Sequence, residues 1–501
     1  MRPGVIVLKL ASLLFGVEVY GSSLAGLTPD TEITAVCDDS RRAVEGCMFI
    51  CLRGTREDGH RYVPDALARG AVVVVCEDTS ALPAGTPYIL VKDTRSACAK
   101  IWNNFCGDPA SKLCIIAVTG TNGKTTTTTL IRELLVAASA AGGPAKFSDT
   151  RLIGTLTGSL TTPDPGELYP LLAKFAGKGA GAVVMEASSH ALALGKLDAL
   201  VPELAVFTNL TPEHLDFHGT MDAYFEAKAK LFRMATLGIA NADEAYFRRL
   251  VEAASCPIIS FSPSGGQAHY RAVNVKFHGT EGSSYTLLGP GVEIEINTKL
   301  CGAFNVANTL AAAAAAIELG APPEAVAKTI AGFTSVKGRF ERVPTPGTGF
   351  DVFIDYAHTP DALENILRTA RAVMNPGGRL TVLFGCGGDR DPYKRPVMGR
   401  VASQLADFSV ITSDNSRSER PADIIAQILK GFDRERPHIV IENRAEAIKY
   451  ALSSAREGDL IILAGKGHED YEITAEGKRH FDEREIVAEW LAERGLGGAK
   501  A

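Results

Sequence analysis

The sequence predicts an α/β protein of three domains, two of them built on parallel sheets. Three observations lead to this fold class. The chain has 501 residues, which corresponds to roughly three domains of about 150 residues. From residue 113 onward, continuous apolar strands alternate with helical stretches, as in a parallel sheet covered on both faces. Several of these strands lead directly into glycine or polar clusters, which is where open α/β sheets bind their ligands.

The composition is that of a globular protein without an overall basic surface. Lysine and arginine number 52 against 58 aspartates and glutamates, so the net charge is −6. This balance argues against general binding to DNA or RNA, which requires a basic face. No apolar run reaches the roughly 18 residues that a membrane helix needs. We therefore expect neither a nucleic-acid partner nor a membrane partner.

The N-terminal stretch resembles an export signal only superficially, because Lys9 interrupts its apolar run. Leu10, Leu13, Leu14 and Val17 recur at helical spacing, which predicts a packed amphipathic helix instead. The ten cysteines lack the paired spacing of zinc sites and lie mostly in apolar contexts. Reduced, buried cysteines are typical of a cytoplasmic protein, which is the location we expect.

The first predicted domain, residues 1–108, is a small α/β domain. The apolar runs 71–75 and 88–91 are predicted to be buried strands. Residues 107–111 combine glycine, aspartate and proline, which indicates a linker to the next domain.

The second predicted domain, residues 109–336, is built on a parallel sheet. Alternating apolar residues between 270 and 300 predict a small β attachment to this sheet, and an alanine-rich helix is expected over 305–319. The strands predicted for the sheet itself are residues 113–118, 182–185 and 204–207.

The third predicted domain, residues 337–501, is a Rossmann-like α/β domain. Each of its predicted strands ends in a polar or glycine cluster, so the four clusters are expected to form one shared site at the same edge of the sheet. These strands are residues 352–354, 380–384, 408–412 and 460–464.

Residues 119–126, with the sequence TGTNGKTT, form the sharpest local motif. They follow a predicted strand and open a predicted helix, as a nucleotide phosphate loop does. Lys124 would contact the β and γ phosphates, and the Thr125 hydroxyl would hold Mg²⁺. The motif departs from the usual spacing, because Val118 stands where the first glycine is expected. The alternative is a glycine-rich turn with a surface lysine.

Acidic and histidine side chains after two other strands are candidates for metal binding. Glu186 follows an apolar strand and can hold Mg²⁺ opposite a phosphate loop, or it can be an acid at a helix start. The segment 208–219 places two histidines and two acids within six residues, which suits a metal site or acid–base chemistry. Its alternative is a polar loop in which Thr211 and Asp216 cap helices. By itself, Lys228 would be a solvated surface lysine.

Taken together, the motifs resemble the Mur ligase family of ATP-dependent enzymes that form amide bonds. The resemblance runs through nearly the whole chain and comprises many motifs in one order. They are residues 39–41, 58–60, 120–126, 186–190, 208–210, 214–219, 338–341, 355–358, 388–391 and 465–469. Residues 161–163 and 414–417 indicate the members that add the third amino acid of the peptide.

The resemblance implies a reaction in two steps, with ATP and Mg²⁺ as cofactors. ATP phosphorylates the free carboxylate of UDP-N-acetylmuramoyl-L-alanyl-D-glutamate, and an amino group of a diamino acid then attacks the acyl phosphate. Both steps crowd negative charge, so fixed cations and exclusion of water are needed. The implied catalytic residues are Lys124, Lys228 and His214, and the implied metal ligands are Thr125, Glu186, His214 and Lys228 as a carbamate.

The same resemblance implies two further groups of binding residues. Lys124 and Arg339 come from different predicted domains, so domain closure would assemble the nucleotide site. The implied ATP-binding residues are Gly120, Thr121, Asn122, Gly123, Lys124, Thr125, Thr126, Asn305, Arg339, Asp355 and His358. The implied contacts to the UDP-linked substrate are Ser40, Thr161, Thr162, Ser188 and Lys196, the last at a position that is often arginine in the family. We expect a monomer.

The loop 414–417 predicts which amino acid is added. Family members with Asp-Asn-Pro-Arg there add meso-diaminopimelate, whose distal carboxylate an arginine can grip with two hydrogen bonds. Here Ser416 replaces the proline, which frees the backbone, and Arg417 is kept. The expected contacts to the diamino acid are Arg390, Asp414, Asn415, Ser416, Arg417, Gly465 and Glu469. Alternatives are the same reaction with L-lysine, a folylpolyglutamate-type synthetase and a regulatory P-loop ATPase module.

Overall fold

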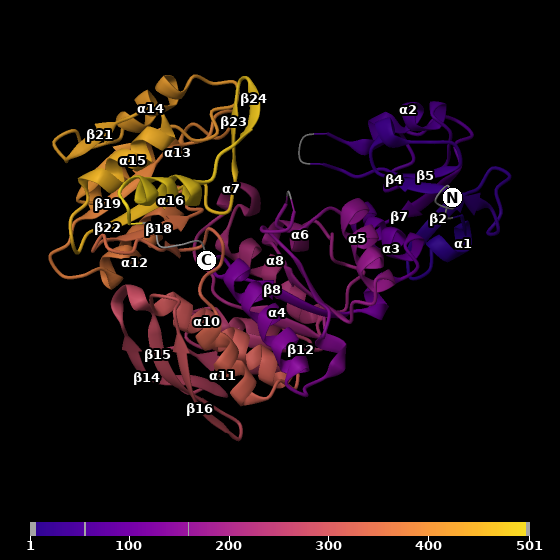
Figure 1. Ribbon diagram of the computed structural model, residues 1–501. Coiled ribbons are helices and arrows are strands. Elements are labelled where there is room, and N and C mark those ends of the chain that lie inside the picture. Colours follow the sequence, from indigo (N-terminus) through magenta and orange to yellow (C-terminus); the bar gives the residue numbers. More distant parts are fainter. Residues whose placement is uncertain (1–6, 55–56, 159, 497–501) are drawn as a thin grey trace. The chain divides into compact units, whose positions relative to one another are not determined.

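The computed structural model describes residues 7–54, 57–158 and 160–496, and its backbone divides into two compact units. The first unit comprises the described residues up to Arg271 together with Leu288–Val292 and Ala307–Thr329. The second comprises Ala272–Leu287, Glu293–Val306 and the described residues from Ile330 onward. Figure 1 shows the elements of both units. No helix within the described ranges is both long and apolar enough to span a membrane.

The first unit begins with a five-stranded sheet in the order β2-β7-β6-β5-β4. The strands β4, β5, β6 and β7 are parallel neighbours, and β2 pairs with β7 in the antiparallel direction. The strands are β1 Leu8–Lys9, β2 Val19–Ser23, β3 Glu32–Ile33, β4 Ala35–Cys37, β5 Cys47–Ile50, β6 Ala71–Cys76 and β7 Tyr88–Val91. The helices are α1 Leu10–Leu13, α2 Val63–Ala68 and α3 Thr94–Phe105, with 3₁₀ turns η1 Ser40–Arg42, η2 Gly59–Tyr62 and η3 Pro109–Lys112.

One expectation about this part of the chain needs correction. The N-terminal amphipathic helix is a single turn, α1, in which Leu10 and Leu13 are buried, while Phe15 beyond it is largely exposed. Within the stretch 107–111, predicted to be a linker, Pro109 opens the 3₁₀ turn η3 and is buried. Proline is favoured at the first position of a helix, since its missing N–H would have no partner there.

The second sheet has nine strands in the order β16-β15-β14-β13-β12-β11-β8-β10-β9, and β9 to β13 run parallel to their neighbours. Its strands are β8 Cys114–Thr119, β9 Thr150–Ile153, β10 Ala182–Glu186, β11 Leu204–Phe207, β12 Leu237–Asn241, β13 Ile258–Ser262, β14 Tyr270–Phe277, β15 Ser283–Gly289 and β16 Val292–Thr298. The remaining helical elements are α4 Lys124–Ala140, η4 Ala145–Phe147, α5 Pro165–Gly177, α6 Ser189–Ala193, α7 Leu215–His218, α8 Met221–Met234, α9 Phe247–Ala253, η5 Gly279–Glu281, α10 Ala303–Glu318 and α11 Pro323–Gly332.

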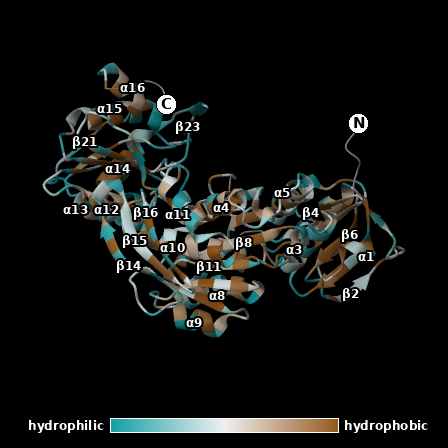
Figure 2. Cartoon of the chain, turned by 60° about the horizontal axis from the view of Figure 1, so that its bottom comes forward, coloured by the Kyte–Doolittle hydropathy of each residue, from teal (hydrophilic) through white to brown (hydrophobic). Residues whose placement is uncertain are grey.

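The predicted strands of the central sheet are present because nothing polar interrupts them. The strands β10 and β11 are buried along their whole length, and β8 is buried except at Cys114. In Figure 2, β8 of this sheet and β6 of the first sheet have the brown colour of hydrophobic residues. The β attachment expected between 270 and 300 consists of β14, β15 and β16, which continue the nine-stranded sheet.

The second unit contains a six-stranded sheet in the order β17-β18-β22-β19-β20-β21. All neighbours run parallel except β17 and β18. The strands are β17 Glu341–Val343, β18 Asp351–Asp355, β19 Leu380–Phe384, β20 Phe408–Ile411, β21 His438–Val440 and β22 Leu460–Ala464, with a separate ribbon of β23 Tyr471–Thr474 and β24 Gly477–His480. The helices are α12 Pro360–Val373, α13 Lys394–Leu405, α14 Pro421–Leu429, α15 Arg444–Ser454 and α16 Glu483–Glu493.

A buried ion pair joins the starts of α15 and α16. The side chains of Arg444 and Glu483 are buried, and Arg444 Nη2 lies 2.8 Å from Glu483 Oε1. Arg444 also donates to the backbone carbonyls of Ser413 (3.1 Å) and Ala464 (2.8 Å), which follow β20 and end β22. One guanidinium therefore holds together the ends of two strands that lead into the predicted diamino-acid site.

We predict that Glu483→Gln destabilises the second unit by about 3–5 kcal/mol, because it leaves the buried guanidinium of Arg444 without its counter-charge. Denaturant unfolding followed by the fluorescence of Trp490, which lies on α16, measures this in a Trp102→Phe background. The control is Glu493→Gln, which removes an exposed pair with Lys449 between the same two helices. Its expected effect is below about 1 kcal/mol, and equal losses in both variants would contradict the prediction.

Candidate functional site

The glycine-rich loop lies between β8 and α4, where the sequence places a phosphate loop. Gly120 has a φ of +151°, and a side chain there would collide with the hydroxyl of Thr208. The Thr208 hydroxyl donates to the carbonyl of Asn122 (2.6 Å), and the Asn122 N–H donates to the side-chain oxygen of Asn209 (2.8 Å). Residues that follow β11 thus fix the shape of the loop, which opens onto the N-terminus of a 17-residue helix.

Two lysines donate to the same backbone carbonyl of this loop. Lys124 Nζ lies 2.9 Å from the carbonyl oxygen of Gly120 and 2.7 Å from that of Thr121. Lys228 Nζ lies 2.8 Å from the carbonyl oxygen of Gly120. The ammonium of Lys124 is therefore held at the loop, as expected for a phosphate-binding lysine.

The expectation that Lys228 is a surface residue is wrong. Its side chain is 1% exposed, and its Nζ lies 4.5 Å from the centre of the Tyr224 ring. Burial, reinforced by the charge of Lys124, holds the pKa of Lys228 well below its ordinary value and so favours the neutral amine. Helical spacing could have indicated this burial, because Lys228 lies four residues after Tyr224 and three after Phe225, on the buried face of α8.

Glu186 is the last residue of β10 and is 2% exposed. One carboxylate oxygen accepts from the N–H of Thr155 (2.8 Å), and the other accepts from the hydroxyl of Thr125 (3.1 Å). The helix after this strand is capped by Ser188, not by Glu186. A buried carboxylate beside a hydroxyl of the phosphate loop offers the oxygen ligands that Mg²⁺ prefers, so these residues fit the ion.

Three histidines gather beside the phosphate loop. The ring of His190 lies 4.8 Å from that of His214 and 5.5 Å from that of His218, centre to centre. Burial, followed by the two neighbouring histidines, lowers the pKa of His190 to about 4. His218 shares a hydrogen bond with the Ser189 hydroxyl (3.0 Å). Sequence reasoning did not assign His190 to this site, because its distance from the segment 208–219 along the chain hid this proximity.

The alternative interpretation of segment 208–219, in which Thr211 and Asp216 cap helices, is not what the backbone shows. His214 occupies the cap position of α7 with a φ of +56°, and Thr220 caps α8. Among the residues that the structure describes, no three or more His, Cys, Asp or Glu side chains are grouped to hold a metal. An ion at Glu186 would therefore need oxygen ligands of other kinds, such as a threonine hydroxyl.

The residues expected to bind the UDP-linked substrate come together in part. The Thr162 hydroxyl donates to the backbone carbonyl of Glu186 (2.8 Å) and lies 3.2 Å from the Ser188 hydroxyl, while Thr161 lies 3.1 Å from the Thr155 hydroxyl. Lys196 is paired with Asp164 at 2.6 Å. The remaining residue, Ser40, is buried on η1.

The expected nucleotide contacts Asn305, Arg339, Asp355 and His358 all belong to the second unit. The Asp355 carboxylate accepts from the N–H groups of Phe340 (2.7 Å) and Ala357 (2.8 Å), and burial raises its pKa. The guanidinium of Arg339 lies 5.1 Å from the centre of the Tyr356 ring. The His358 ring nitrogen and the Tyr356 carbonyl are 2.8 Å apart, and Asn305 donates to the Cys301 carbonyl (2.9 Å).

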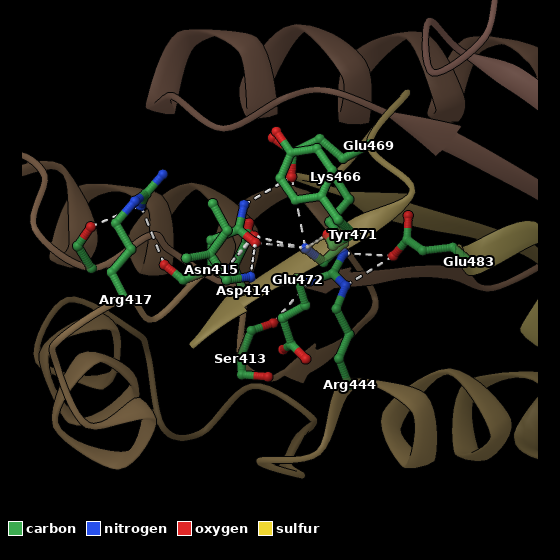
Figure 3. A network of polar contacts seen from close by, with 12 residues as sticks. Ser413, Asp414, Asn415, Arg417, Arg444, Lys466, Glu469, Tyr471, Glu472 and Glu483 are labelled. Carbon is green, nitrogen blue, oxygen red and sulfur yellow. Dashed lines mark hydrogen bonds and ion pairs between the residues drawn. The ribbon is translucent and has the colours of Figure 1, made fainter. Parts of the chain in front are cut away.

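The residues expected to bind the diamino acid form one network after β20 and β22 (Figure 3). The side-chain amide of Asn415 donates to Glu469 (2.8 Å). Arg417, with a φ of +50°, donates to the carbonyls of Gly388 (2.8 Å) and Asn415 (3.3 Å). A side chain at Gly465 would meet the Asp414 carboxylate at 2.7 Å. Ser416, which stands in place of the proline, is buried.

Arg390 is exposed, but it lies close to this network, because Gly387 has no side chain to separate it from Arg417. A side chain at Gly387 would lie 2.9 Å from Arg417 Nη1 and 3.8 Å from Arg390 Cγ. The structure also adds two residues that the sequence did not single out. Lys466 is fully buried among the residues of the network, and the backbone carbonyl of Tyr471 accepts a hydrogen bond from it (2.9 Å).

Comparison with known proteins gives the same family over the whole chain. Three family models match in succession: "Mur ligase family, catalytic domain" over residues 32–106, "Mur ligase middle domain" over 118–316 and "Mur ligase, glutamate ligase domain" over 338–467. The chain is 42% identical to the UDP-N-acetylmuramoyl-L-alanyl-D-glutamate–2,6-diaminopimelate ligase of Caldanaerobacter subterraneus, over 97% of this chain and 99% of the relative. The protein of the same name from Geobacter metallireducens is 41% identical over 94% and 96%.

Among solved structures, one of a UDP-N-acetylmuramoyl-L-alanyl-D-glutamate–2,6-diaminopimelate ligase aligns with a TM-score of 0.68 and 31% identity, covering 98% of this chain and 99% of that one. A crystal structure of MurF from Acinetobacter baumannii aligns with a TM-score of 0.58 and 21% identity, over 97% and 99%. The second likeness concerns the fold alone.

We predict that Gly120→Ala weakens ADP binding by about tenfold or more, because the added methyl group cannot fit beside the Thr208 hydroxyl and displaces the loop amides. Titration calorimetry with ADP measures the effect. The matched control is Gly142→Ala, since Gly142 also has a positive φ, of +91°, but has nothing within 4 Å of the added atom. Unchanged affinity in Gly120→Ala would show that the loop does not need this glycine.

Proposed function

The chain belongs to the Mur ligase family, and from this premise we propose that it adds meso-diaminopimelate to UDP-N-acetylmuramoyl-L-alanyl-D-glutamate, using ATP, in the synthesis of peptidoglycan precursors. The family consists of ligases that form amide bonds at the expense of ATP. Support for this member of the family comes from the full-length similarity to ligases named for 2,6-diaminopimelate. The single structural observation that carries the choice of amino acid is the arrangement of Arg417 beside Asn415 and Glu469.

That arrangement suits the distal end of meso-diaminopimelate, which carries one carboxylate and one ammonium group. The guanidinium of Arg417 can donate hydrogen bonds to the carboxylate, and the carboxylate of Glu469 can accept hydrogen bonds from the ammonium. L-lysine has no distal carboxylate and would leave the guanidinium without its partner. Arg390, Asp414, Ser416 and Gly465 complete the proposed pocket.

In the proposed reaction, an oxygen of the D-glutamate carboxylate attacks the γ-phosphorus of ATP, and ADP leaves. The amino group of the diamino acid then attacks the acyl carbon, phosphate leaves, and the nitrogen loses a proton. The phosphate-loop N–H groups from Gly120 to Thr126 and the start of α4 would orient the phosphates. The ammonium of Lys124 would offset the charge that develops on the transferred phosphoryl group.

Thr125, Glu186, His214 and a carbamate on Lys228 are the residues that would hold Mg²⁺. When bound, the ion would compensate negative charge on the phosphates and on the acyl phosphate. The neutral amine favoured at Lys228 is the form that adds to carbon dioxide; the nitrogen then releases a proton to water, and the resulting carbamate is an anion with oxygen ligands. The carbonyl of Gly120, 2.8 Å from Nζ, fixes the direction of that side chain.

Binding of the two nucleotides completes the proposal. Ser40, Thr161, Thr162, Ser188 and Lys196 would contact the UDP-linked substrate. The second unit would contribute Asn305, Arg339, Asp355 and His358 to ATP, so that closure of the domains excludes water from the acyl phosphate. We propose three functional domains, 1–108, 109–336 and 337–501, in a monomeric cytoplasmic enzyme.

We predict that the protein joins meso-diaminopimelate to UDP-N-acetylmuramoyl-L-alanyl-D-glutamate in preference to L-lysine at equal concentration. Product mass after incubation with ATP, Mg²⁺ and each amino acid measures the preference. Arg417→Ala should raise the KM for diaminopimelate by about tenfold to a hundredfold, because a charged hydrogen-bonding partner of the carboxylate is lost. Arg420→Ala, at an exposed arginine three residues further along, should leave it unchanged.

The outcomes of this assay separate the alternatives. A preference for L-lysine would contradict the assignment of the amino acid but keep the ligase. A product with a folate and glutamate would favour a folylpolyglutamate-type synthetase. ATP hydrolysis that proceeds equally fast without either substrate would favour a regulatory ATPase.

We predict that Lys228→Ala reduces the rate of product formation by about a hundredfold or more, because the proposed anionic ligand is lost. Short carboxylic acids such as acetate or propionate should restore part of the rate by supplying a carboxylate in the space of the missing side chain. Lys230→Ala is the control: this lysine lies on the same helix, pairs with Asp198 at 2.6 Å, and its loss should cause neither the defect nor the rescue. A Lys228→Ala variant with unaltered activity would remove the carbamate from the proposal.

A further inference from the structure

Lys466 is a buried lysine beside the diamino-acid network, and the proposed mechanism assigns it no role. It follows β22, its side chain has no exposed surface, and its ammonium lies among the side chains expected to bind the diamino acid (Figure 3). Nζ donates to the Asn415 side-chain oxygen at 3.0 Å and to the Tyr471 carbonyl at 2.9 Å. It lies 3.6 Å from an oxygen of Asp414 and 3.7 Å from one of Glu469.

We propose that Lys466 is a positioning residue for the diamino acid, which acts by fixing the side-chain amide of Asn415 and the carboxylates of Asp414 and Glu469. This inference rests on the proposed function and adds to it a residue that does not itself touch the substrate. Nζ donates hydrogen bonds to two protein oxygens and lies near carboxylate oxygens of Asp414 and Glu469, so it holds the pocket in shape and leaves Arg417 and Glu469 to meet the ligand.

The first argument concerns the orientation of Asn415. Its side-chain oxygen accepts from Lys466 Nζ and also from the N–H of Ile473 (2.9 Å). Two donors at one end of an amide leave only one orientation, because a flipped NH₂ group would face both of them. The NH₂ group must therefore point the other way, where it donates to Glu469 at 2.8 Å. Lys466 thus sets the position of the Glu469 carboxylate through Asn415.

The second argument concerns charge. Asp414 and Glu469 are both buried or nearly so, and two carboxylates at such a site cannot easily stay ionised together. Although burial opposes it, the charges of Lys466 and Arg444 lower the pKa of Asp414. Burial raises the pKa of Glu469, and Asn415 and Lys466 oppose that rise. Lys466 therefore favours the charged form of both carboxylates, and the Glu469 carboxylate can then accept a hydrogen bond from the substrate ammonium.

A purely structural role is already filled by a different cation. Arg444 pairs with Glu483 and donates to the carbonyls at Ser413 and Ala464, so it holds the strand ends. The contacts of Lys466 instead go to Asn415, Tyr471, Asp414 and Glu469, which lie beyond those ends. Arg444 therefore fixes the backbone of the strand ends, while Lys466 fixes side chains of the pocket.

The test measures steady-state kinetics of Lys466→Met and Lys466→Gln in the full-length protein with ATP, Mg²⁺, UDP-N-acetylmuramoyl-L-alanyl-D-glutamate and meso-diaminopimelate. We expect the KM for diaminopimelate to rise by about tenfold to a hundredfold, with the KM for ATP unchanged within about twofold. The glutamine side chain is one bond shorter than lysine and carries no charge, so it cannot reproduce these contacts, and this variant serves if the methionine variant does not fold. Arg379→Met is the matched control, because it removes a cation paired with Asp459, which precedes β22 at the end opposite to Lys466, and it should leave both KM values unchanged.

A double-mutant cycle distinguishes positioning from general loosening. If Lys466 acts through Asn415, the rise in KM for diaminopimelate caused by Lys466→Met is at least about threefold smaller in an Asn415→Ala background than in the wild type. Full additivity of the two effects, or an unchanged KM in a folded Lys466→Gln variant, would overturn the inference. A wild-type protein that makes no product with diaminopimelate would instead contradict the proposed function, so the two failures are distinguishable.

Discussion

The organisation of this protein depends on one constraint: a parallel strand buried on both faces cannot carry chemistry within its own length. The strands β10, β11 and β22 are entirely buried, and their polar side chains first appear where each strand ends. Because neighbouring strands run in the same direction, those ends meet at one edge of each sheet. Glu186 and the loop after β11 meet the phosphate loop in this way, and the residues after β20 and β22 form the network of the second unit.

The same constraint explains why the candidate sites contain so many buried charges. Side chains at the ends of buried strands lie partly in a low-dielectric surrounding, where an unpaired charge is costly. The structure meets this cost in different ways at the two sites. At the phosphate loop, Lys228 has a lowered pKa that favours its neutral form. In the second unit, Lys466 remains among carboxylates and Arg444 remains paired with Glu483. Of these two sites, only the phosphate loop has a neutral amine, that of Lys228, available for covalent chemistry.

Local sequence patterns predicted the strands well, but they did not predict contacts between residues far apart in the sequence. The runs 88–91 and 204–207 coincide with β7 and β11, because continuous apolar residues are a strong signal. The short strands β17 and β21 lie at the edges of their sheet, where fewer apolar residues are needed, and they were not predicted. Among the site residues, the burial of Lys228 was misjudged from its residue type. The approach of His190 to His214 and the position of Lys466 depend on contacts between segments far apart in the sequence, which local patterns do not predict.

Because Arg444 fixes the backbone behind the pocket, stability and ligand specificity depend on different residues, which matters for engineering. Its guanidinium fixes the backbone at Ser413 and Ala464, so the spacing between the two loops is set behind the pocket, before the residues that face a ligand begin. Substitutions at the loop tips can therefore change what is recognised without loosening the frame. This makes the stretch from Asn415 to Arg417 the place where a library of variants can be screened for a new amino-acid preference while the rest of the enzyme is left untouched.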